Sequence, residues 1–149
     1  MKEIRKHIYD RIRNNATIRA ATGFTASNPR VYLEFPQEEI ILSGAFSAYL
    51  ILGSFGETEV PEYRRVMEAQ RPDIDFSIDI LATTPDIKDD LGSVIYNLFN
   101  NYFFSTVSRR ILSVKYNSSG DFVEIHPDTE QITAYRKNMR FSIGLVYGH

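Results

Sequence analysis

The chain has 149 residues, a formal net charge of −2 and 43% hydrophobic residues, a composition typical of a soluble globular chain with one core. It contains no cysteine, which excludes disulfides, iron–sulfur clusters and thiolate zinc sites. The basic N-terminus lacks the apolar segment of a secretory signal, and the most apolar window, residues 40–52, is too short to cross a bilayer. We therefore expect a single domain over residues 1–149 with no membrane partner.

The small net charge conceals strong segregation of charge along the chain. Residues 1–30 carry seven basic and two acidic side chains, whereas residues 31–62 carry six acidic side chains and no basic one. Residues 73–104 carry six acidic side chains against one lysine, Lys88. Two explanations stay open: a solvated surface whose charged blocks alternate along the chain, or oppositely charged faces through which copies of the protein stack or pair.

The first predicted element is a short amphipathic helix over residues 2–15 with a basic outer face. The prediction depends on isoleucines that recur every four residues: Ile4, Ile8 and Ile12. Asn14 and Asn15 are expected to end this helix. Residues 16–29, with their glycine, serine and proline, are expected to form a long connector.

Three strands are predicted next along the chain. Residues 30–35 are β-branched and aromatic and stop at Pro36, and residues 48–52 form an apolar run that predicts a buried strand before Gly53. The clearest pattern is that of residues 74–80, where apolar and polar side chains alternate. One face of this strand is therefore expected to pack against a core and the other to contact water.

Residues 53–73 separate the last two of these strands, and so long a segment without an assured structure is uncommon in a compact domain. A short helix around residues 61–70 and a β-ribbon that extends the flanking strands both fit its apolar positions. The segment is either a surface loop or an arm that reaches a neighbouring subunit. Four of its side chains belong to types enriched at interfaces and are the candidate interface residues: Tyr63, Arg64, Arg65 and Arg71.

A second helix is predicted to begin at Thr84-Pro85-Asp86, which supplies an N-cap, a proline at the first helical position and an acid in the first turn. This helix is expected to cover the packed face of the sheet. Its apolar side chains recur at helical spacing: Ile87, Leu91, Val94, Ile95, Leu98, Phe99 and Tyr102.

The C-terminal part of the chain predicts further strands. Residues 111–116 and 122–126 are apolar runs, and residues 117–121 between them have the composition of a hairpin turn. His126-Pro127-Asp128 is best explained as another turn. Residues 135–147 alternate as a final strand, on which Arg140 is expected to lie across from an aspartate of residues 74–80, either Asp75 or Asp79.

Motifs that carry chemistry are absent from the sequence. The three histidines are far apart in the chain, and no nucleophile elbow, phosphate-binding loop or dinucleotide-binding motif occurs. Asp86, Asp89 and Asp90 are explained by the dipole at the start of the second helix rather than by a metal. We assign no catalytic, cofactor-binding or metal-binding residues, and we predict that the chain is not an enzyme.

Basic residues gather near the N-terminus, but the sequence pI of about 5.9 is far below that of a dedicated nucleic-acid binder. A basic helix can still line a passage for DNA through phosphate contacts alone. The residues concerned are Arg5, Lys6, Arg11, Arg13, Arg19 and Arg30.

The order of these elements resembles that of the tail terminator proteins of long-tailed bacteriophages. The resemblance includes the strand that starts at residues 30–32, a Tyr-led strand that ends in Gly at residues 49–53, the long arm, the alternating residues 75–80, the helix and a closing strand at residues 140–143. It covers nearly the whole chain, although the family has no catalytic signature and no fixed motif residues.

The resemblance implies an α+β fold with a mixed, mainly antiparallel β-sheet, packed by an N-terminal helix and a central helix, with a long protruding loop or arm. It implies a structural virion protein that forms a ring, a hexamer, which caps the tail tube and joins the tail to the head connector. The implied partners are further copies of the chain, the tail tube protein and the connector protein, with DNA passing through the ring without sequence readout.

This role requires no cofactor and places the protein in the virion, after assembly in the host cytoplasm. The candidate interface residues of residues 53–73 would then contact another subunit or the tail tube. Two alternatives stay open. The first is a head-completion or connector protein that contacts the portal side, and the second is a small α+β enzyme or ligand-binding domain.

Overall fold

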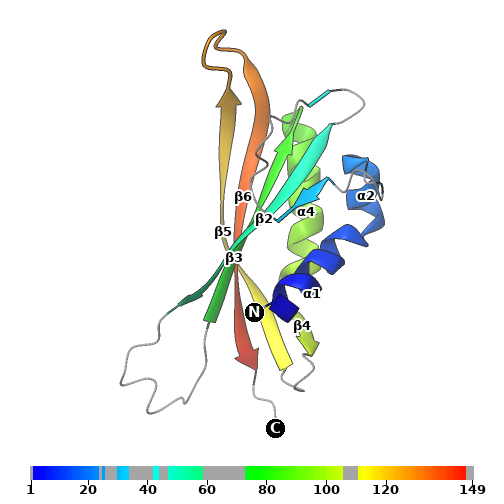
Figure 1. Cartoon of the computed structure of the whole chain (residues 1–149), viewed down its shortest axis with the longest axis vertical. Coiled ribbons are helices and arrows are strands. Elements are labelled where there is room, and N and C mark those ends of the chain that lie inside the picture. Colours follow the sequence, from blue (N-terminus) through cyan, green and yellow to red (C-terminus); the bar gives the residue numbers. More distant parts are fainter. Residues whose placement is uncertain are drawn as a thin grey trace.

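A computed structural model describes the chain over residues 2–23, 25, 30–33, 42–43, 47–58, 73–105 and 111–146. Its elements are, in order, α1 (Lys2–Arg13), α2 (Ala16–Thr22), β1 (Val31–Tyr32), β2 (Ala48–Thr58), β3 (Asp73–Ala82), α4 (Pro85–Phe99), β4 (Tyr102–Ser105), β5 (Ile111–Ile125) and β6 (Ile132–Val146). The helices lie along one side of a strongly twisted sheet (Figure 1). None of the helices in the described ranges combines the length and the apolar character needed to span a membrane.

The six strands form one sheet in the order β1-β2-β3-β6-β5-β4. β1 runs parallel to β2, and every other neighbouring pair is antiparallel. The predicted fold class, an α+β fold with a mixed and mainly antiparallel sheet, is confirmed. The central pair is β3 and β6, which are the alternating strand and the closing strand of the sequence prediction.

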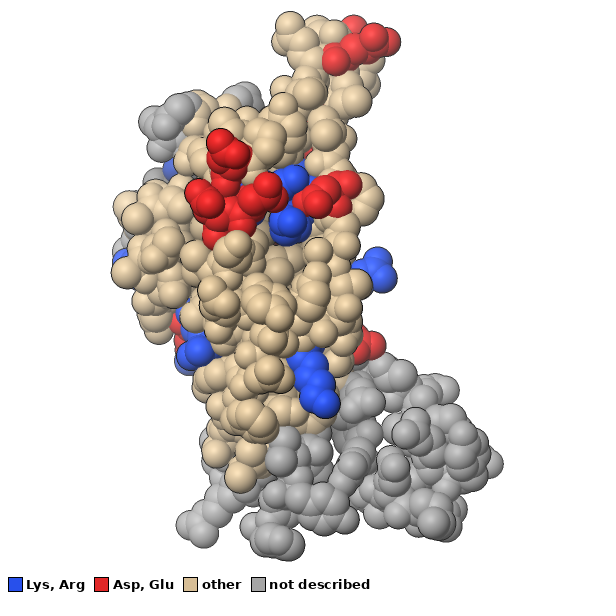
Figure 2. Space-filling view, turned by 180° about the vertical axis from the view of Figure 1, so that it is seen from behind, with Lys and Arg blue, Asp and Glu red and all other residues tan. Residues whose placement is uncertain are grey.

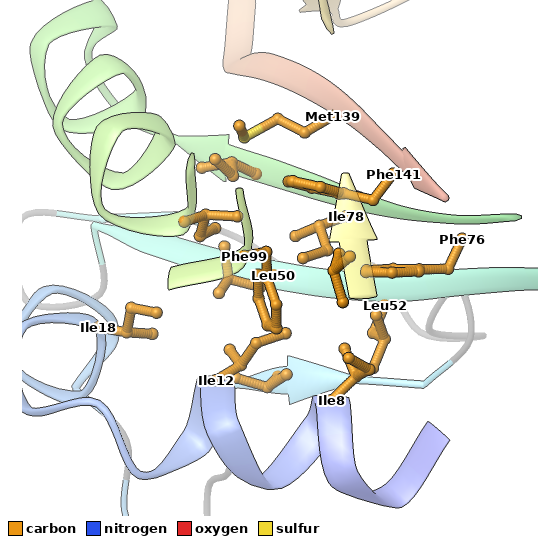
Figure 3. Packing of buried hydrophobic residues seen from close by; sticks show 14 of the residues in the cluster. Ile8, Ile12, Ile18, Leu50, Leu52, Phe76, Ile78, Phe99, Met139 and Phe141 are labelled. Carbon is orange, nitrogen blue, oxygen red and sulfur yellow. The ribbon is translucent and has the colours of Figure 1, made fainter. Parts of the chain in front are cut away.

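The main core lies between the sheet and the three helices (Figure 3). β3 contributes its even positions, as its alternation predicts, and β6 contributes Met139, Phe141 and Ile143. Phe76 is the centre of an aromatic group, because its ring lies 5.2 Å from the rings of Phe55 and Phe141 and 6.0 Å from that of Phe99. Such ring pairs stabilise a core beyond the area that they bury.

Helix α4 begins as the sequence predicts. The Thr84 side chain accepts a hydrogen bond from the Ile87 amide at 3.2 Å, and Pro85 occupies the first turn. Leu91, Ile95 and Phe99 are fully or almost fully buried against the sheet. The predicted helical stripe is wrong at its last member, because the chain leaves the helix after Phe99 through Asn101, at φ +58°, and Tyr102 opens β4.

The predicted connector over residues 16–29 is wrong in its first half, because residues 16–22 form a second helix, α2. Asn15 separates the two helices as expected, but its side chain also caps the second one by accepting a hydrogen bond from the Ile18 amide at 3.0 Å. Gly23 ends α2 at φ +66°, a left-handed conformation that residues with a side chain rarely adopt. Ile18 and Thr22 are buried, so α2 belongs to the body of the fold.

The predicted hairpin turn at residues 117–121 is also wrong. β5 continues through this segment from Ile111 to Ile125, and a register shift between Tyr116 and Ser118 accommodates the extra residue. The polar residues do not end the strand because β6 pairs with β5 along its whole length. The chain turns instead after His126, where the His-Pro-Asp turn was predicted.

A second, smaller apolar cluster lies on the opposite face of the sheet. Tyr49, Ile51, Leu81 and Ala134 are buried there, with Tyr32 and Leu42 packed against them. β2 is therefore buried on both faces in residues 48–52, as predicted. The expectation that the second face of β3 contacts water fails at this end, where Asp79 is also buried.

The predicted arm over residues 53–73 falls partly within the described residues. Residues 53–58 continue β2 and pair with β3, so that Glu57 lies opposite Ile74 and Thr58 opposite Asp73. This pairing agrees with the β-ribbon alternative for these residues. Residues 59–72, the rest of the predicted arm and its possible helix, lie outside the described residues, as does most of the predicted strand over residues 30–35.

Candidate assembly interface

The end of the β5–β6 hairpin projects beyond the body of the molecule (Figure 1). We call residues 121–135 the outer hairpin. Its turn is closed by two backbone hydrogen bonds, in which the His126 amide donates to the Gln131 carbonyl at 2.8 Å and the Glu130 amide donates to the His126 carbonyl at 3.0 Å. Glu130 adopts φ +56°, which reverses the chain direction. The predicted turn at residues 126–128 is confirmed, and it stands at the tip of the projection.

Large apolar side chains are exposed on the outer hairpin. Their exposed fractions are 55% for Phe122, 47% for Val123, 56% for Ile125 and 52% for Ile132. Phe122 and Val123 follow each other in a strand and therefore point to opposite faces of the ribbon. Both faces of the ribbon thus present apolar surface to solvent. A group of exposed apolar side chains of this kind is typical of an interaction surface.

The outer hairpin is acidic, whereas the first two helices are basic. Residues 121–135 contain four acidic side chains and no Lys or Arg, and acidic atoms are visible at the projecting tip (Figure 2). Helices α1 and α2 together contain six basic and two acidic side chains. Four of the basic residues are exposed: Arg5, Lys6, Arg13 and Arg19. The outer hairpin and the first two helices are therefore two oppositely charged surfaces, of which only the basic one belongs to a charged block noted in the sequence, residues 1–30.

A cluster of four charged side chains braces the base of the outer hairpin against helix α4. Lys88 Nζ lies 2.9 Å and Lys137 Nζ 3.2 Å from the same oxygen of Asp121, and both amines also lie within 3.7 Å of Asp89. The hydrogen bond from Lys88 lowers the pKa of Asp121, with a further contribution from Lys137. Gly92 allows this approach, because a Cβ there would lie 2.9 Å from Lys137 Cδ.

A second charged network lies on the other face of the sheet, where the hairpin leaves the body. Arg136 donates to both carboxylate oxygens of Asp79, at 3.3 and 3.2 Å, and to Glu124 at 3.2 Å. Asn138 donates to Asp79 at 2.7 Å. Burial acts to lower the pKa of Arg136, but the hydrogen bonds and charges of Asp79 and Glu124 raise it above its ordinary value. The network therefore links β6 to β3 and to β5 at the base of the hairpin through charge-assisted hydrogen bonds.

An open groove of about 570 Å³ runs beside this network and is lined by charged and polar side chains that include Asp79, Arg136 and Arg140. The acid and base groups nearest to it are engaged with one another, and burial raises the pKa of the neighbouring Tyr49 to about 12, so this phenol holds its proton at neutral pH. Among the described side chains that line it, Asp79 accepts hydrogen bonds from Arg136 and Asn138, and Arg140 donates to Asn138.

The junction between α1 and the α4–β4 corner is also polar. His7 Nε2 lies 2.7 Å from the Tyr102 hydroxyl, and the Arg11 guanidinium lies 3.7 Å above the centre of the Tyr102 ring. Arg11 Nε donates to the Leu98 carbonyl at 3.0 Å. Burial, followed by the charge of Arg11, lowers the pKa of His7. These contacts attach α1 to the end of α4, and Arg11, one of the residues expected to line a DNA passage, takes part in them.

The four predicted interface residues, Tyr63, Arg64, Arg65 and Arg71, lie outside the described residues, so their assignment stays a prediction. Arg140 lies directly opposite Ser77 rather than opposite an aspartate, so its predicted pairing is wrong. Its guanidinium donates to Asn138 at 3.3 Å.

Of the three aspartates assigned to the start of the second helix, Asp86 lies in the first turn of α4, as the dipole argument expects. Asp89 instead contacts Lys88 and Lys137. Within the described ranges, no group of three or more His, Asp and Glu side chains is placed to hold a metal ion.

The outer hairpin was missed by the sequence interpretation. A signal for it exists, because residues 122–125 place apolar side chains at both odd and even positions, directly before a polar turn. A strand buried on one face only would alternate instead. Turns were predicted on both sides of this segment, at residues 117–121 and at residues 126–128, so a short strand was expected in place of the outer part of a long hairpin.

No family model matches the chain, and no curated protein matches it. Among solved structures, the chain is similar to a chain of one that is described as "Virion of native gene transfer agent (GTA) particle". The superposition has a TM-score of 0.67 and covers 97% of this chain and 95% of that chain, with 12% sequence identity. At this identity the similarity establishes a shared fold.

Proposed function

We propose that this chain is a structural protein of a phage-like virion that forms a ring, a hexamer, at the end of the tail tube and joins the tail to the head connector. The observation that carries the proposal is the fold shared, over nearly the full length of both chains, with a chain from a gene transfer agent particle. The element order that resembles tail terminator proteins supports the same role. Residues 1–149 act in it as one domain.

The surfaces of the chain support a role in assembly. A ring of identical subunits needs two different patches on each subunit, which meet across every contact and close by rotation. The exposed apolar residues of the outer hairpin and the basic outer surface of α1 and α2 lie on different flanks of the molecule (Figure 1). Ring formation by such patches requires neither an active site nor a cofactor.

In this proposal the partners are further copies of the chain, the tail tube protein and the head connector protein, and DNA passes through the ring without base-specific contacts. The protein is located in the virion, after assembly in the host cytoplasm. The internally paired charges of the sheet groove support a role that is not enzymatic.

The proposal is tested by mixing the purified chain with uncapped tail tubes formed by the tube protein of the same particle, and by imaging the mixture by electron microscopy. We expect a ring at one end of each tube and an arrest of further tube growth. Tail tubes that stay uncapped while the chain binds isolated portal or connector complexes would contradict the tail role and favour a head-completion protein.

A further inference from the structure

We propose that the outer hairpin of one subunit docks on the outer surface of helices α1 and α2 of the next subunit. This inference rests on the proposed ring and specifies which two surfaces meet in it. It commits to a second copy of this chain as the occupant of the hairpin.

The first argument is the apolar surface of the outer hairpin. Ile125 and Ile132 lie directly opposite each other across the two strands, and each is more than half exposed. With Phe122 and Val123 they leave apolar surface on both faces of a projecting ribbon. Covering these side chains provides the favourable free energy of a contact, because apolar area removed from water stabilises the associated state.

The second argument is charge complementarity between the two surfaces. The outer hairpin carries four acidic and no basic side chains, a formal charge of −4, and α1 with α2 carries six basic and two acidic ones, a formal charge of +4. The outer hairpins of two subunits would repel each other because both are acidic. The charges therefore disfavour hairpin-to-hairpin pairing and favour a head-to-tail contact. The aliphatic stems of Arg and Lys, with exposed Ala16 and Ala20, offer apolar contact beneath these charges.

The third argument is the position and rigidity of the hairpin. It projects from one end of the molecule, whereas α1 and α2 lie along one side (Figure 1), so a contact between the two surfaces joins different patches of successive subunits, the arrangement that closes a ring by rotation. Lys88 and Lys137 on one face and Arg136 on the other hold the base of the hairpin to the body. A rigid projection loses less conformational entropy on docking than a loop would.

The contact is tested by disulfide trapping, since the natural chain has no cysteine. Chains with Thr129→Cys at the hairpin turn are mixed with chains that carry Ala20→Cys on α2, so every disulfide reports a contact between copies. The matched control replaces Ala20→Cys by Lys115→Cys, an exposed position on β5 below the outer hairpin. We expect about tenfold more cross-linked dimer with Ala20→Cys than with the control, because docking raises the effective concentration of the paired thiols.

Charge reversal provides the second test. Chains with Asp128→Lys and Glu130→Lys are expected to associate at least about tenfold more weakly than the parent, and chains with Arg13→Glu and Arg19→Glu should show the same loss. Combining all four substitutions in one chain should restore association, which is measured by analytical ultracentrifugation with circular dichroism as the control for folding.

Three outcomes separate this inference from the proposed function. Selective trapping together with rescue by the combined reversal supports the docking. Rings that cap tail tubes but show equal trapping in both mixtures and tolerate each reversal would overturn the docking and leave the tail role in place. A parent chain that stays monomeric both in solution and with tail tubes would overturn the ring, and the docking with it.

Discussion

Strands β5 and β6 pass through two different environments. We call their part in the outer hairpin the outer half and the rest of the two strands the inner half. Two cross-strand pairs of β-branched residues show the difference. Val114 lies opposite Ile143 in the inner half, and both are fully buried. Ile125 lies opposite Ile132 in the outer half, and their side chains are 56% and 52% exposed. The side-chain chemistry of the two pairs is nearly the same, so the pairs differ in whether other parts of the chain cover them.

In the inner half, that cover comes from helix α4. Its buried Phe99 lies 5.7 Å from the ring of Phe141 on β6, and Ile95 is fully buried in the same core. The outer half extends past this cover and is held to the body by charged side chains instead. Apolar residues on the inner half therefore stabilise the fold, and those on the outer half are available for contact with another chain.

The largest effect on the inner half is expected from Phe99→Ala. Phe99 is fully buried and contacts three other rings, those of Phe76, Tyr102 and Phe141. Its loss should lower the free energy of unfolding by about 3–5 kcal/mol, because a large cavity remains in the core. Urea denaturation measures this change. Leu98→Ala, at a partly buried neighbour in the same helix, is the control and should cost less; equal costs would contradict the packing of α4.

A smaller loss of stability is expected when the charged network of Arg136, Asp79 and Glu124 is interrupted. Arg136→Met keeps the aliphatic stem but leaves the Asp79 carboxylate, which is only 5% exposed, with Asn138 as its remaining side-chain donor. We expect destabilisation of about 2–3 kcal/mol, since a buried charge loses its charged partner. The control is Glu124→Gln, which removes the exposed carboxylate and should cost less than about 1 kcal/mol. Similar costs for both variants in thermal unfolding would show that Asp79 tolerates the loss.

The elements that build the main core were largely predictable from the sequence, because the signals for them are local. The alternation in residues 74–80 placed β3, and Thr84-Pro85 placed the start of α4. Both depend on residues within one element and on the period of that element. The α+β class followed from the same local patterns once they were combined with the resemblance.

The outer half was not predictable, because non-local pairing decides it. Residues 117–121 have the composition of a turn, yet β6 supplies a partner for this segment and the strand continues through it. Asn15 has a similar double meaning, since an asparagine after one helix is also a good N-cap for the next. Apolar side chains at both odd and even positions of residues 122–125 indicate a strand without a single buried face, but whether Ile125 is covered depends on how far α4 extends along β5 and β6 in space.

The ion pairs that join Asp121 of the outer hairpin to Lys88 and Lys137 should make the stability of the chain depend on pH. The Asp121 pKa is lowered below its ordinary value of 3.8, chiefly by the hydrogen bond from Lys88. A carboxylate with a lowered pKa in the folded state contributes stability above the unfolded value, and that contribution disappears as the pH falls through the folded value. We therefore expect Asp121→Asn to destabilise the chain by less than about 1 kcal/mol at pH 6, since the side chain is 56% exposed.

The difference between the parent and Asp121→Asn should then shrink below pH 3.8, and urea unfolding curves at pH 6, 4 and 3 measure it without adding salt. Added salt should also reduce the difference at pH 6, because exposed ion pairs are screened. A difference that stays constant from pH 6 to pH 3 would mean that Lys88 and Lys137 do not hold the charged form of Asp121.

The smallest effect on folding is expected in the outer half, and it completes the comparison between the two pairs. Ile132→Thr keeps a β-branched side chain in the strand and should change the free energy of unfolding of the monomer by only about 0.5 kcal/mol, because the side chain is already 52% exposed. Val114→Thr makes a similar change of chemistry in the inner half, where the new hydroxyl is buried without a partner, and should cost about 1–3 kcal/mol. Chemical denaturation at a concentration where the chain is monomeric compares the two variants directly. If Ile132→Thr costs as much as Val114→Thr, the outer hairpin is part of the stabilising core, and its apolar side chains are not free for a neighbouring subunit.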